Sequence, residues 1–336
     1  MMQWWMAPLV VLVSLLLTAS LRHYALARSL IDVPGPRRSH VVPTPRGGGM
    51  AIVVSFLSVI VLLAGSQMLN GAMLCAMLGG GGLVAVIGFI DDHRHIPVRW
   101  RLLGHFVAAA WGLYWVGGVP PLVMFGVAVS LEWIGAAVTV LYLVWLLNLY
   151  NFMDGIDGIA GVEAVSVCLG VSLIYWLGEG EHLMVVPLAL MLAVLGFLYW
   201  NFPSAKIFMG DAGSGFLGLV MGLLSLHAGW ESSQLFWCWL ILLGVFVVDA
   251  TYTLIRRLFR GMRPYEAHRS HAYQRASLRA GTHLPVTLAV LLINVFWLLP
   301  VAVCVILFDI DGAVGLLIAY VPLLVLAVAY NAGGKE

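Results

Sequence analysis

Two amides and two carboxylates recur at every third position of one short segment. They are Asn148, Asn151, Asp154 and Asp157. The segment directly follows the apolar stretch Val138–Leu147 and is interspersed with glycines at the same spacing. Such polar groups are costly in hydrocarbon unless they are paired, hydrated or bound to a ligand. The segment therefore predicts a water-filled ligand site at the mouth of a membrane-embedded helix bundle.

These four polar groups cannot all line one face of a regular helix. A spacing of three residues drifts by about 60° per step in an α-helix, so Asn148 and Asp157 fall on opposite sides. We therefore expect either that the helix ends among the glycines or that the groups serve different tasks. Some would face a ligand, and others would brace neighbouring spans. Helix capping explains Asp154 or Asp157 singly, but not the whole set.

A pair of adjacent carboxylates, Asp91 and Asp92, ends another apolar stretch. Adjacent carboxylates repel each other, which raises the pKa of at least one unless a cation neutralises the pair. A divalent metal, a bound phosphate–metal complex or the neighbouring Arg94, Arg99 and Arg101 would resolve this conflict. The pair alone leaves open a ligand site and a solvated acidic pair balanced by arginine.

A single carboxylate, Asp211, opens a later apolar stretch within the sequence Phe-Met-Gly-Asp-Ala-Gly-Ser that starts at Phe208. At a helix N-terminus it would meet free backbone N–H groups and the positive end of the helix dipole. Helix capping explains part of this, but the glycines also leave open space around the side chain. Mg²⁺ prefers few carboxylates together with phosphate oxygens and waters. Asp211 is therefore the predicted metal ligand.

A basic loop near the end of the chain carries Arg263, His268 and His271. Two histidines three residues apart can share a helical face. Together with arginine they supply donors and positive charge for a diphosphate. For the arginines taken singly, binding to lipid headgroups is the alternative. Zinc binding is disfavoured because neither a cysteine nor a third ligand accompanies the histidines.

The elements that must position these groups are predicted from composition. Of the 336 residues, 62% are hydrophobic and 10% are charged, which indicates an all-α, polytopic integral membrane protein. Apolar runs of about 17–22 residues fit spanning helices. Eleven such runs are expected, at 4–24, 49–66, 72–90, 102–118, 133–149, 159–177, 184–200, 213–229, 236–255, 285–307 and 313–330.

Charge predicts the orientation of these spans. With eleven spans, all 17 Lys and Arg residues lie on one side, and the opposite loops carry only acids. Lys and Arg accumulate on the cytoplasmic side, so the N-terminus is expected in the periplasm and the C-terminus in the cytoplasm. Residues 1–336 are expected to form one domain. Its predicted functional loops, all cytoplasmic, are 28–48, 91–101, 148–158, 201–211 and 256–283. Two further acids within spans, Glu163 and Asp249, are left outside the predicted site.

Taken in order, these motifs resemble the polyprenyl-phosphate N-acetylhexosamine-1-phosphate transferases, which are integral membrane enzymes of bacterial glycosyltransferase family 4. The resemblance runs from about Asp32 to Gln274. Its motifs are Asp32-Val-Pro-Gly-Pro-Arg-Arg-Ser-His40 with Thr44-Pro-Arg-Gly-Gly48, Asp91-Asp92, Asn148 to Asp157-Gly, Phe208-Met-Gly-Asp211 and the His268 loop. Each motif is weak alone, but the set is specific.

The resemblance implies transfer of a sugar 1-phosphate from a UDP-N-acetylhexosamine to undecaprenyl phosphate, giving a lipid-linked diphospho-sugar and UMP. It implies a Mg²⁺ requirement, with Mn²⁺ as an alternative ion, and makes Asp211 the metal ligand. Asp91 and Asp92 match the pair that positions or deprotonates the lipid phosphate. The predicted substrate-binding residues are Asn148, Asn151, Asp154, Asp157, Asn201 and Phe208 on the nucleotide side, and Arg263, His268 and His271 in the loop that closes over the diphosphate and sugar.

The last loop departs from the pattern of the family. Many members carry His-x-His-His there, whereas this chain reads His268-Arg-Ser-His271. The His triplet of the phospho-muramoyl-pentapeptide branch is absent. This favours the branch that initiates O-antigen or related surface polysaccharide, and leaves fucosamine, quinovosamine and glucosamine donors open. The expected setting is the bacterial inner membrane, with membrane lipid and the two substrates as partners and no nucleic acid. A homodimer is compatible with these expectations.

Two other classes of function were weighed against the transferase. A cation-coupled membrane transporter should place ionisable groups near the bilayer midplane, often in repeated halves. This chain instead gathers them at the predicted cytoplasmic ends of its spans. A non-enzymatic lipid-binding assembly protein would need the basic loops, but not Asp211 or the run of amides and carboxylates.

Overall fold

The computed structural model describes residues 6–33, 35, 42–129, 132–178, 180–262 and 268–334. Its helices, in chain order, are α1 (Met6–Ala27), α2 (Met50–Gly65), α3 (Gly71–Cys75), η1 (Ala76–Gly81), α4 (Gly82–His93), α5 (Val98–Val116), α6 (Glu132–Met153), α7 (Ile159–Leu177), η2 (Glu181–Leu183), α8 (Val185–Asn201), α9 (Asp211–Glu231), α10 (Ser233–Leu242), α11 (Gly244–Phe259), α12 (Ala272–Ala280), α13 (Leu284–Ile293), η3 (Asn294–Leu298), α14 (Leu299–Leu307) and α15 (Gly312–Ala329). Two short antiparallel ribbons pair β1 (Ile31–Asp32) with β2 (Thr44–Pro45), and β3 (Leu122–Met124) with β4 (Val127–Val129). The all-α membrane class is confirmed.

Each of the eleven predicted spans coincides with a helix or a run of consecutive helical segments. Within the described ranges, eight helices are long and apolar enough to cross a membrane. The pair α10 and α11, which meets at a bend of 71°, makes a ninth. The two remaining predicted spans correspond to α2, which is apolar but only 16 residues long, and to α5. The number that cross the bilayer, and their orientation, stay predictions.

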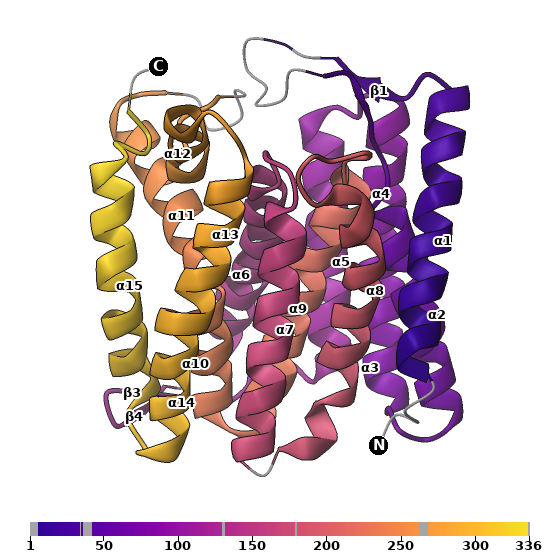
Figure 1. Cartoon of the computed structure of the whole chain (residues 1–336). Coiled ribbons are helices and arrows are strands. Elements are labelled where there is room, and N and C mark those ends of the chain that lie inside the picture. Colours follow the sequence, from indigo (N-terminus) through magenta and orange to yellow (C-terminus); the bar gives the residue numbers. More distant parts are fainter. Residues whose placement is uncertain are drawn as a thin grey trace.

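The helices form an up-and-down bundle whose connections alternate between its two ends (Figure 1). The ribbon of β3 and β4 lies at one end, and β1, α12 and the C-terminal end of α15 lie at the other. Because successive helices reverse direction, the second end also receives the described residues of all five loops that the sequence predicts to be functional. We call it the loop end of the bundle.

Helix α9 is the central element of the bundle and begins at Asp211. It is the most buried of the long apolar helices and packs against α4 and α6. A side chain at Gly88 of α4 would overlap the backbone of Ala212, so glycine is needed for the close approach of α4 to the first turn of α9. This packing brings Asp211 beside the carboxylates that end α4 and the amides that end α6.

Candidate active site

A polar cavity of about 270 Å³ opens at the loop end of the bundle. Seven of the predicted site residues line it: Asp92, Asn151, Asp154, Asp157, Asn201, Phe208 and Asp211. Residues that the sequence did not single out complete the wall, among them Gln274 and His283. The predicted site residues of three separate loops, 91–101, 148–158 and 201–211, therefore meet around one cavity.

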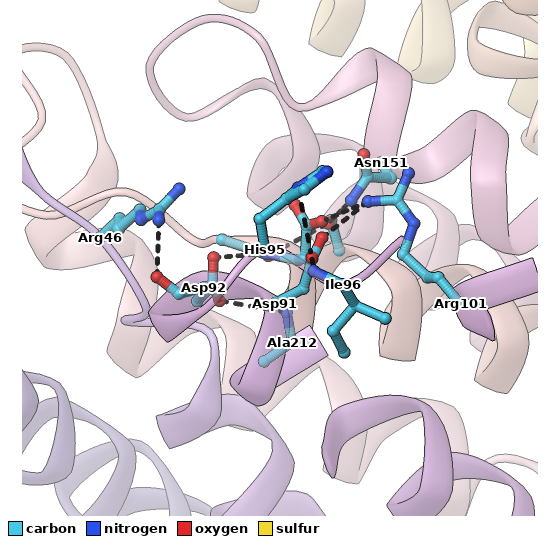
Figure 2. Close-up of polar contacts among 11 residues, drawn as sticks. Arg46, Asp91, Asp92, His95, Ile96, Arg101, Asn151 and Ala212 are labelled. Carbon is cyan, nitrogen blue, oxygen red and sulfur yellow. Dashed lines mark hydrogen bonds and ion pairs between the residues drawn. The ribbon is translucent and has the colours of Figure 1, made fainter. Parts of the chain in front are cut away.

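The carboxylate of Asp92 caps helix α9 from the neighbouring helix α4. Its Oδ1 accepts a hydrogen bond from the Asp211 N–H at 3.3 Å, and its Oδ2 accepts one from the Ala212 N–H at 3.4 Å (Figure 2). Arg46 Nη2 donates to the Asp92 carbonyl at 2.6 Å. Asp92 is 3% exposed. Its contacts therefore fix the N-terminus of α9 and, with it, the position of Asp211.

Arg101 of α5 links the other two predicted catalytic carboxylates. Its Nη1 donates to Asp91 Oδ2 at 2.7 Å and to Asp211 Oδ2 at 3.1 Å (Figure 2). Asp91 Oδ1 also accepts from the Ile96 N–H at 2.6 Å. Asp91 is thus neutralised by one of the three arginines named from the sequence, and it is not among the residues that line the polar cavity.

The surroundings of Asp211 fit a magnesium ion better than a closed metal cage. No cluster of three or more His, Cys, Asp or Glu side chains arranged to hold a metal ion occurs among the described residues. Asp211 instead faces the polar cavity, beside Asn151, whose Nδ2 donates to Ser214 Oγ at 3.1 Å. Mg²⁺ is commonly held by one or two carboxylates, waters and substrate phosphates. Asp211, which shares the open polar cavity with Asp92, Asp154 and Asp157, can contribute one carboxylate to such a donor set.

The run of amides and carboxylates divides as its helical geometry requires. Helix α6 ends at Met153, and the chain passes through the glycine-containing turn 154–158 into α7. Asn151, Asp154 and Asp157 reach the polar cavity. Asn148 Nδ2 donates to the Val144 carbonyl at 2.7 Å, and Asn148 lines a different space, described below. Of the two alternatives expected from the sequence, the structure shows the first: helix α6 ends beside the glycines, before Asp154. The tasks of the four groups stay a prediction.

Asp157 and Asn201 brace the loops around the cavity. Asp157 Oδ1 lies 3.0 Å from His283 Nδ1, and Oδ2 accepts from the Ala205 N–H at 3.0 Å. Asn201 Oδ1 accepts from the Gly158 N–H at 3.1 Å, while its Nδ2 donates to the Ile207 carbonyl at 3.0 Å. Both side chains line the cavity, yet their polar atoms are engaged by backbone groups and by the His283 ring. The only sequence signal for His283 is its place at the end of the predicted loop 256–283.

Phe208 is positioned by the motif at 44–48. The Phe208 N–H donates to the Pro45 carbonyl at 2.8 Å, and the Phe208 carbonyl accepts from the Gly48 N–H at 2.9 Å. The next step of this ladder joins the Gly49 N–H to the Met209 carbonyl at 2.8 Å. The strand-like pairing explains why the two motifs occur together: one holds the aromatic ring of the other at the cavity wall.

The environment of Asp154 disfavours its charged form. Burial, followed by the negative charges of Asp211, Asp92 and Asp157, raises the pKa of Asp154 well above its usual range. Because the folded state binds this proton more tightly than the unfolded state does, protonation of Asp154 stabilises the protein. This stabilisation is complete below the unfolded-state pKa of about 3.9. That stabilisation is lost as the pH rises through the folded-state pKa.

Asp154→Asn is therefore expected to flatten the pH dependence of stability and to raise the melting temperature at pH 8. One proton contributes a slope of at most about 1.4 kcal/mol per pH unit. The measurement is thermal unfolding between pH 5 and pH 9 in a buffer free of divalent metal. Asp309→Asn, which neutralises an exposed carboxylate at the opposite end of the bundle, is the control. Equal pH slopes for wild type and Asp154→Asn would contradict the assignment.

The histidine loop is held by Asp249, a residue that the sequence reasoning left outside the site. Asp249 Oδ1 lies 3.3 Å from His271 Nδ1, and its carboxylate accepts from the N–H groups of Ala272 and Tyr273 at 2.9 and 3.0 Å. His271 is thereby fixed at the start of α12. The sequence signal that could have identified Asp249 is its position within an apolar span, where carboxylates are rare.

The two predicted histidines do not share a helical face. His268 precedes α12, and its ring stacks on that of His271 with centroids 5.0 Å apart. Burial and the positive charges of His271 and Arg257 lower the pKa of His268 to about 3. His268 is therefore neutral at physiological pH and offers hydrogen bonding rather than charge. Arg263, the third predicted residue of this loop, lies outside the described residues.

A larger, mainly apolar groove of about 740 Å³ adjoins the polar cavity. We call it the apolar groove; it lies along α5, α6 and α11 and is lined by Val98, Arg101, Leu102, Leu141, Val144, Trp145, Asn148, Asn151, Phe152, Leu254, His268, His271 and Gln274. Asn151 and Gln274 line both spaces. An apolar chain in the groove would thus end beside Arg101 and the histidines.

The segment 332–334 ties the histidine loop to the end of α15. The Gly333 N–H donates to the Ser270 carbonyl at 2.7 Å, between the two histidines. Arg256 and Arg275 donate to the carbonyls of Ala332 and Gly334 at 2.7 and 2.9 Å. Gly333 has φ +66°, and a Cβ there would lie 3.0 Å from the Arg256 side chain. This segment is a positioning element that the sequence did not reveal.

Gly333→Ala is expected to loosen the histidine loop, because the substitution strains the backbone and displaces Arg256. A strain of about 1 kcal/mol corresponds to roughly fivefold in local opening. The measurement is the rate of tryptic cleavage after Arg269 and Arg275. Gly118→Ala, with similar φ but open space and a place at the opposite end, is the matched control. Unchanged cleavage in Gly333→Ala would show that the segment does not hold the loop.

Comparisons with known proteins agree with this geometry. Residues 73–229 match the model of glycosyl transferase family 4. The chain is 29% identical over 287 residues to a probable undecaprenyl-phosphate N-acetylglucosaminyl 1-phosphate transferase of Bacillus subtilis, covering 83% of this chain and 78% of that protein. It is 30% identical over 291 residues to a decaprenyl-phosphate N-acetylglucosaminephosphotransferase of Mycolicibacterium smegmatis, covering 77% and 71%. It is also 30% identical over 278 residues to a phospho-N-acetylmuramoyl-pentapeptide-transferase of Pelotomaculum thermopropionicum, covering 74% and 82%.

These matches extend over most of each relative, and the residues matched by the family model include the loops 91–101, 148–158 and 201–211. The family predicted from the order of the motifs is confirmed, whereas its O-antigen branch stays a prediction. The chain belongs to glycosyl transferase family 4.

Proposed function

We propose that this protein transfers N-acetylhexosamine 1-phosphate from a UDP-sugar to undecaprenyl phosphate, forming undecaprenyl-diphospho-sugar and UMP. The relatives from Bacillus and Mycolicibacterium are named for transfer of N-acetylglucosamine phosphate to a polyprenyl phosphate. The observation that carries the proposal is the meeting of the polar cavity and the apolar groove at Asn151 and Gln274, beside Asp211. A polar donor and an apolar acceptor need such adjoining spaces.

In this proposal the nucleotide occupies the polar cavity and the prenyl chain occupies the apolar groove. Phe208, held by the ladder to residues 45–49, offers its ring to the base. Asp154 and Asn151 line the cavity wall nearer to Asp211. The phosphate of the lipid would lie at the polar end of the groove, where Arg101, His268 and His271 can donate to its oxygens. The two substrates then meet end to end, which favours in-line transfer.

Asp211 would hold the Mg²⁺ ion, and Asn151 and Ser214 lie beside it. The bound ion would supply positive charge between two anionic substrates whose mutual repulsion otherwise opposes the reaction. Arg101 adds a fixed positive charge. His268, being neutral, donates a hydrogen bond without binding the anion as a counter-ion. Mn²⁺ is the expected substitute ion.

Positioning is the proposed role of both Asp91 and Asp92. Asp91 is engaged by Arg101, and Asp92 is engaged by the first turn of α9. A phosphate monoester has a second pKa near 6 and is already largely ionised at neutral pH, so the acceptor requires little help from a base. The two carboxylates would instead keep Arg101 and Asp211 in place.

The proposed setting is the bacterial inner membrane, with the loop end in the cytoplasm, where the reaction would start O-antigen or related surface polysaccharide synthesis. The absence of a His triplet at 268–271 supports this branch over one acting on a muramoyl-pentapeptide precursor. Family membership does not favour the cation-coupled transporter.

The test of the proposed function is a donor panel. Purified protein would be incubated with Mg²⁺, undecaprenyl phosphate and, in turn, the UDP derivatives of N-acetylglucosamine, N-acetylfucosamine and N-acetylquinovosamine. Release of UMP that depends on lipid, metal and one of these donors is expected. Absence of UMP with every donor would contradict the proposal.

A further inference from the structure

A second apolar cavity lies between α11, α12, α13 and α15, and we call it the side cavity. Its volume is about 280 Å³, and it shares no lining residue with the polar cavity or the apolar groove. Its walls are formed largely by aliphatic side chains such as Val248, Val290 and Leu323. The proposed transfer reaction assigns no role to this space.

The sequence of α12 creates the roof of the side cavity. Ala272, Ala276 and Ala280 follow one another at intervals of four residues and all line the cavity, so apart from Tyr273 the lining side chains of α12 are small. Asp249 is the only charged lining residue. Its carboxylate accepts from the N–H groups of Ala272 and Tyr273. The interior therefore offers an apolar surface, with its one carboxylate already hydrogen-bonded.

The side cavity opens laterally between α13 and α15. Pro285 and Ala289 of α13 are exposed, and Leu326 of α15 is 41% exposed, whereas Val286, Val290 and Leu323 are buried at the back. In the predicted membrane arrangement this opening faces acyl chains. An apolar cavity open to hydrocarbon favours an aliphatic chain, which buries its surface against the lining at no desolvation cost to polar groups.

The rim of the side cavity at the loop end is cationic. The guanidinium of Arg279 lies 5.0 Å from the ring centroid of Tyr330, and Tyr330 lines the cavity. Arg256, Arg260 and Arg275 donate to the carbonyls of residues 332–334. Carbonyl groups are neutral, so these contacts of Arg256 and Arg260 do not compensate the positive charges of the two side chains. A basic rim beside an apolar cavity fits an amphiphile with an anionic head.

We propose that the side cavity binds one acyl chain of an anionic phospholipid from the surrounding bilayer, with the lipid phosphate at Arg279. The cavity has less than half the volume of the apolar groove, which suits a short length of acyl chain better than a long prenyl chain. His271 is the N-cap residue of α12, and Tyr273 of α12 donates to the Phe152 carbonyl at 2.9 Å. The bound lipid would therefore support the helix that follows the histidine loop.

The test compares thermal unfolding in nanodiscs of phosphatidylcholine with that in nanodiscs of phosphatidylglycerol, without substrate or metal. Wild type should melt at a higher temperature in phosphatidylglycerol. We call the difference in melting temperature between the two lipids the lipid shift. Ala276→Leu fills the cavity and should abolish the lipid shift. Arg279→Gln should reduce the lipid shift. In native mass spectrometry this variant should retain phosphatidylglycerol about tenfold less well than wild type, as expected for the loss of one charge-assisted contact. Arg28→Gln is the control: it removes another arginine that lies over a tyrosine ring, and it should show the same lipid shift as wild type.

Three results would overturn the proposal. The first is a lipid shift of wild-type size in both Ala276→Leu and Arg279→Gln. This result counts against the proposal even if Ala276→Leu lowers the melting temperature equally in both lipids. The second is an equal melting temperature of wild type in the two lipids. The third is a rise in melting temperature that undecaprenyl phosphate produces and phosphatidylglycerol does not, and that is absent in Ala276→Leu. None of these readouts needs transferase activity, so a failed donor panel and a failed lipid test are distinguishable.

Discussion

Asp211→Asn is expected to lower the rate of sugar 1-phosphate transfer by about a thousandfold, the scale found when a preorganised electrostatic group is removed from an active site. Asparagine has nearly the same shape but no charge to hold a divalent cation. The cap on α9 should persist, because Asp92 accepts hydrogen bonds from backbone N–H groups that the substitution leaves intact. Arg101 also keeps its contact with Asp91.

The measurement is steady-state turnover together with the melting temperature of the same preparation. Asp311→Asn is the matched control, because Asp311 also lies at a helix N-terminus, where it accepts from the N–H groups of Ala313 and Val314 at the opposite end of the bundle. It should retain nearly full activity. Turnover of wild-type size in Asp211→Asn would remove Asp211 from the proposed metal site.

Asp92 should respond differently to asparagine and to alanine. Asp92→Ala leaves the first N–H groups of α9 unpaired, which costs about 1–2 kcal/mol of stability for a lost helix cap. Because Asp211 lies in that first turn, we expect turnover to fall by about a hundredfold, as when a group that orients a metal ligand is removed. Asp92→Asn retains a side-chain oxygen and a capping role, so it should keep most of the stability and more of the activity.

A general base would give another pattern. Neither asparagine nor alanine can accept a proton at neutral pH, so a base role predicts equal losses of turnover for the two variants. The comparison is made as kcat over pH 5.5 to 9 with matched melting temperatures. Equal losses in Asp92→Asn and Asp92→Ala, without loss of stability in either, would contradict the capping role.

The sequence was sufficient to locate the long apolar helices, because each predicted span is a long apolar run and polar loops separate these runs. Helix α12, which is polar, lies inside the predicted loop 256–283 and was not located. The same segregation of charge predicted which loops meet at one end. The period of three in the run from Asn148 to Asp157 also predicted that its members would divide. That inference needed only helical geometry. The structure places Asn148 on the groove, Asn151 on both spaces, and Asp154 and Asp157 on the cavity.

The roles of individual side chains were less accessible, because they depend on how helices cross. Asp92 caps α9 only because α4 approaches within contact of its first turn at Gly88, a tertiary feature without a local sequence signal. The sequence alone does not show which of Arg94, Arg99 and Arg101 contacts the carboxylates. The orientation of α5 decides that it is Arg101. The segment at 332–334 bonds to a loop about sixty residues earlier, and no pattern in either stretch indicates this pairing.

Asp249 illustrates a partial success of sequence reasoning. A carboxylate inside an apolar span is unusual and marks Asp249 in the sequence. Its role depends on α12, whose first N–H groups donate hydrogen bonds to it. Glu163 is similar: it is fully buried, and its Oε2 accepts from Asn294 Nδ2 at 2.7 Å, which links α7 to the helical run 284–307. Composition marks such residues, whereas packing decides their roles.

The most direct test of the central claim is the fate of the β-phosphorus of the donor. A UDP-N-acetyl sugar labelled with ³²P at the β-phosphate would be incubated with purified protein, Mg²⁺ and undecaprenyl phosphate, and the lipid and aqueous fractions would be separated. Transfer of a sugar 1-phosphate predicts label in the lipid fraction and UMP as the nucleotide product. Label that stays in the aqueous fraction, with UDP as the product or no product at all, would contradict the account.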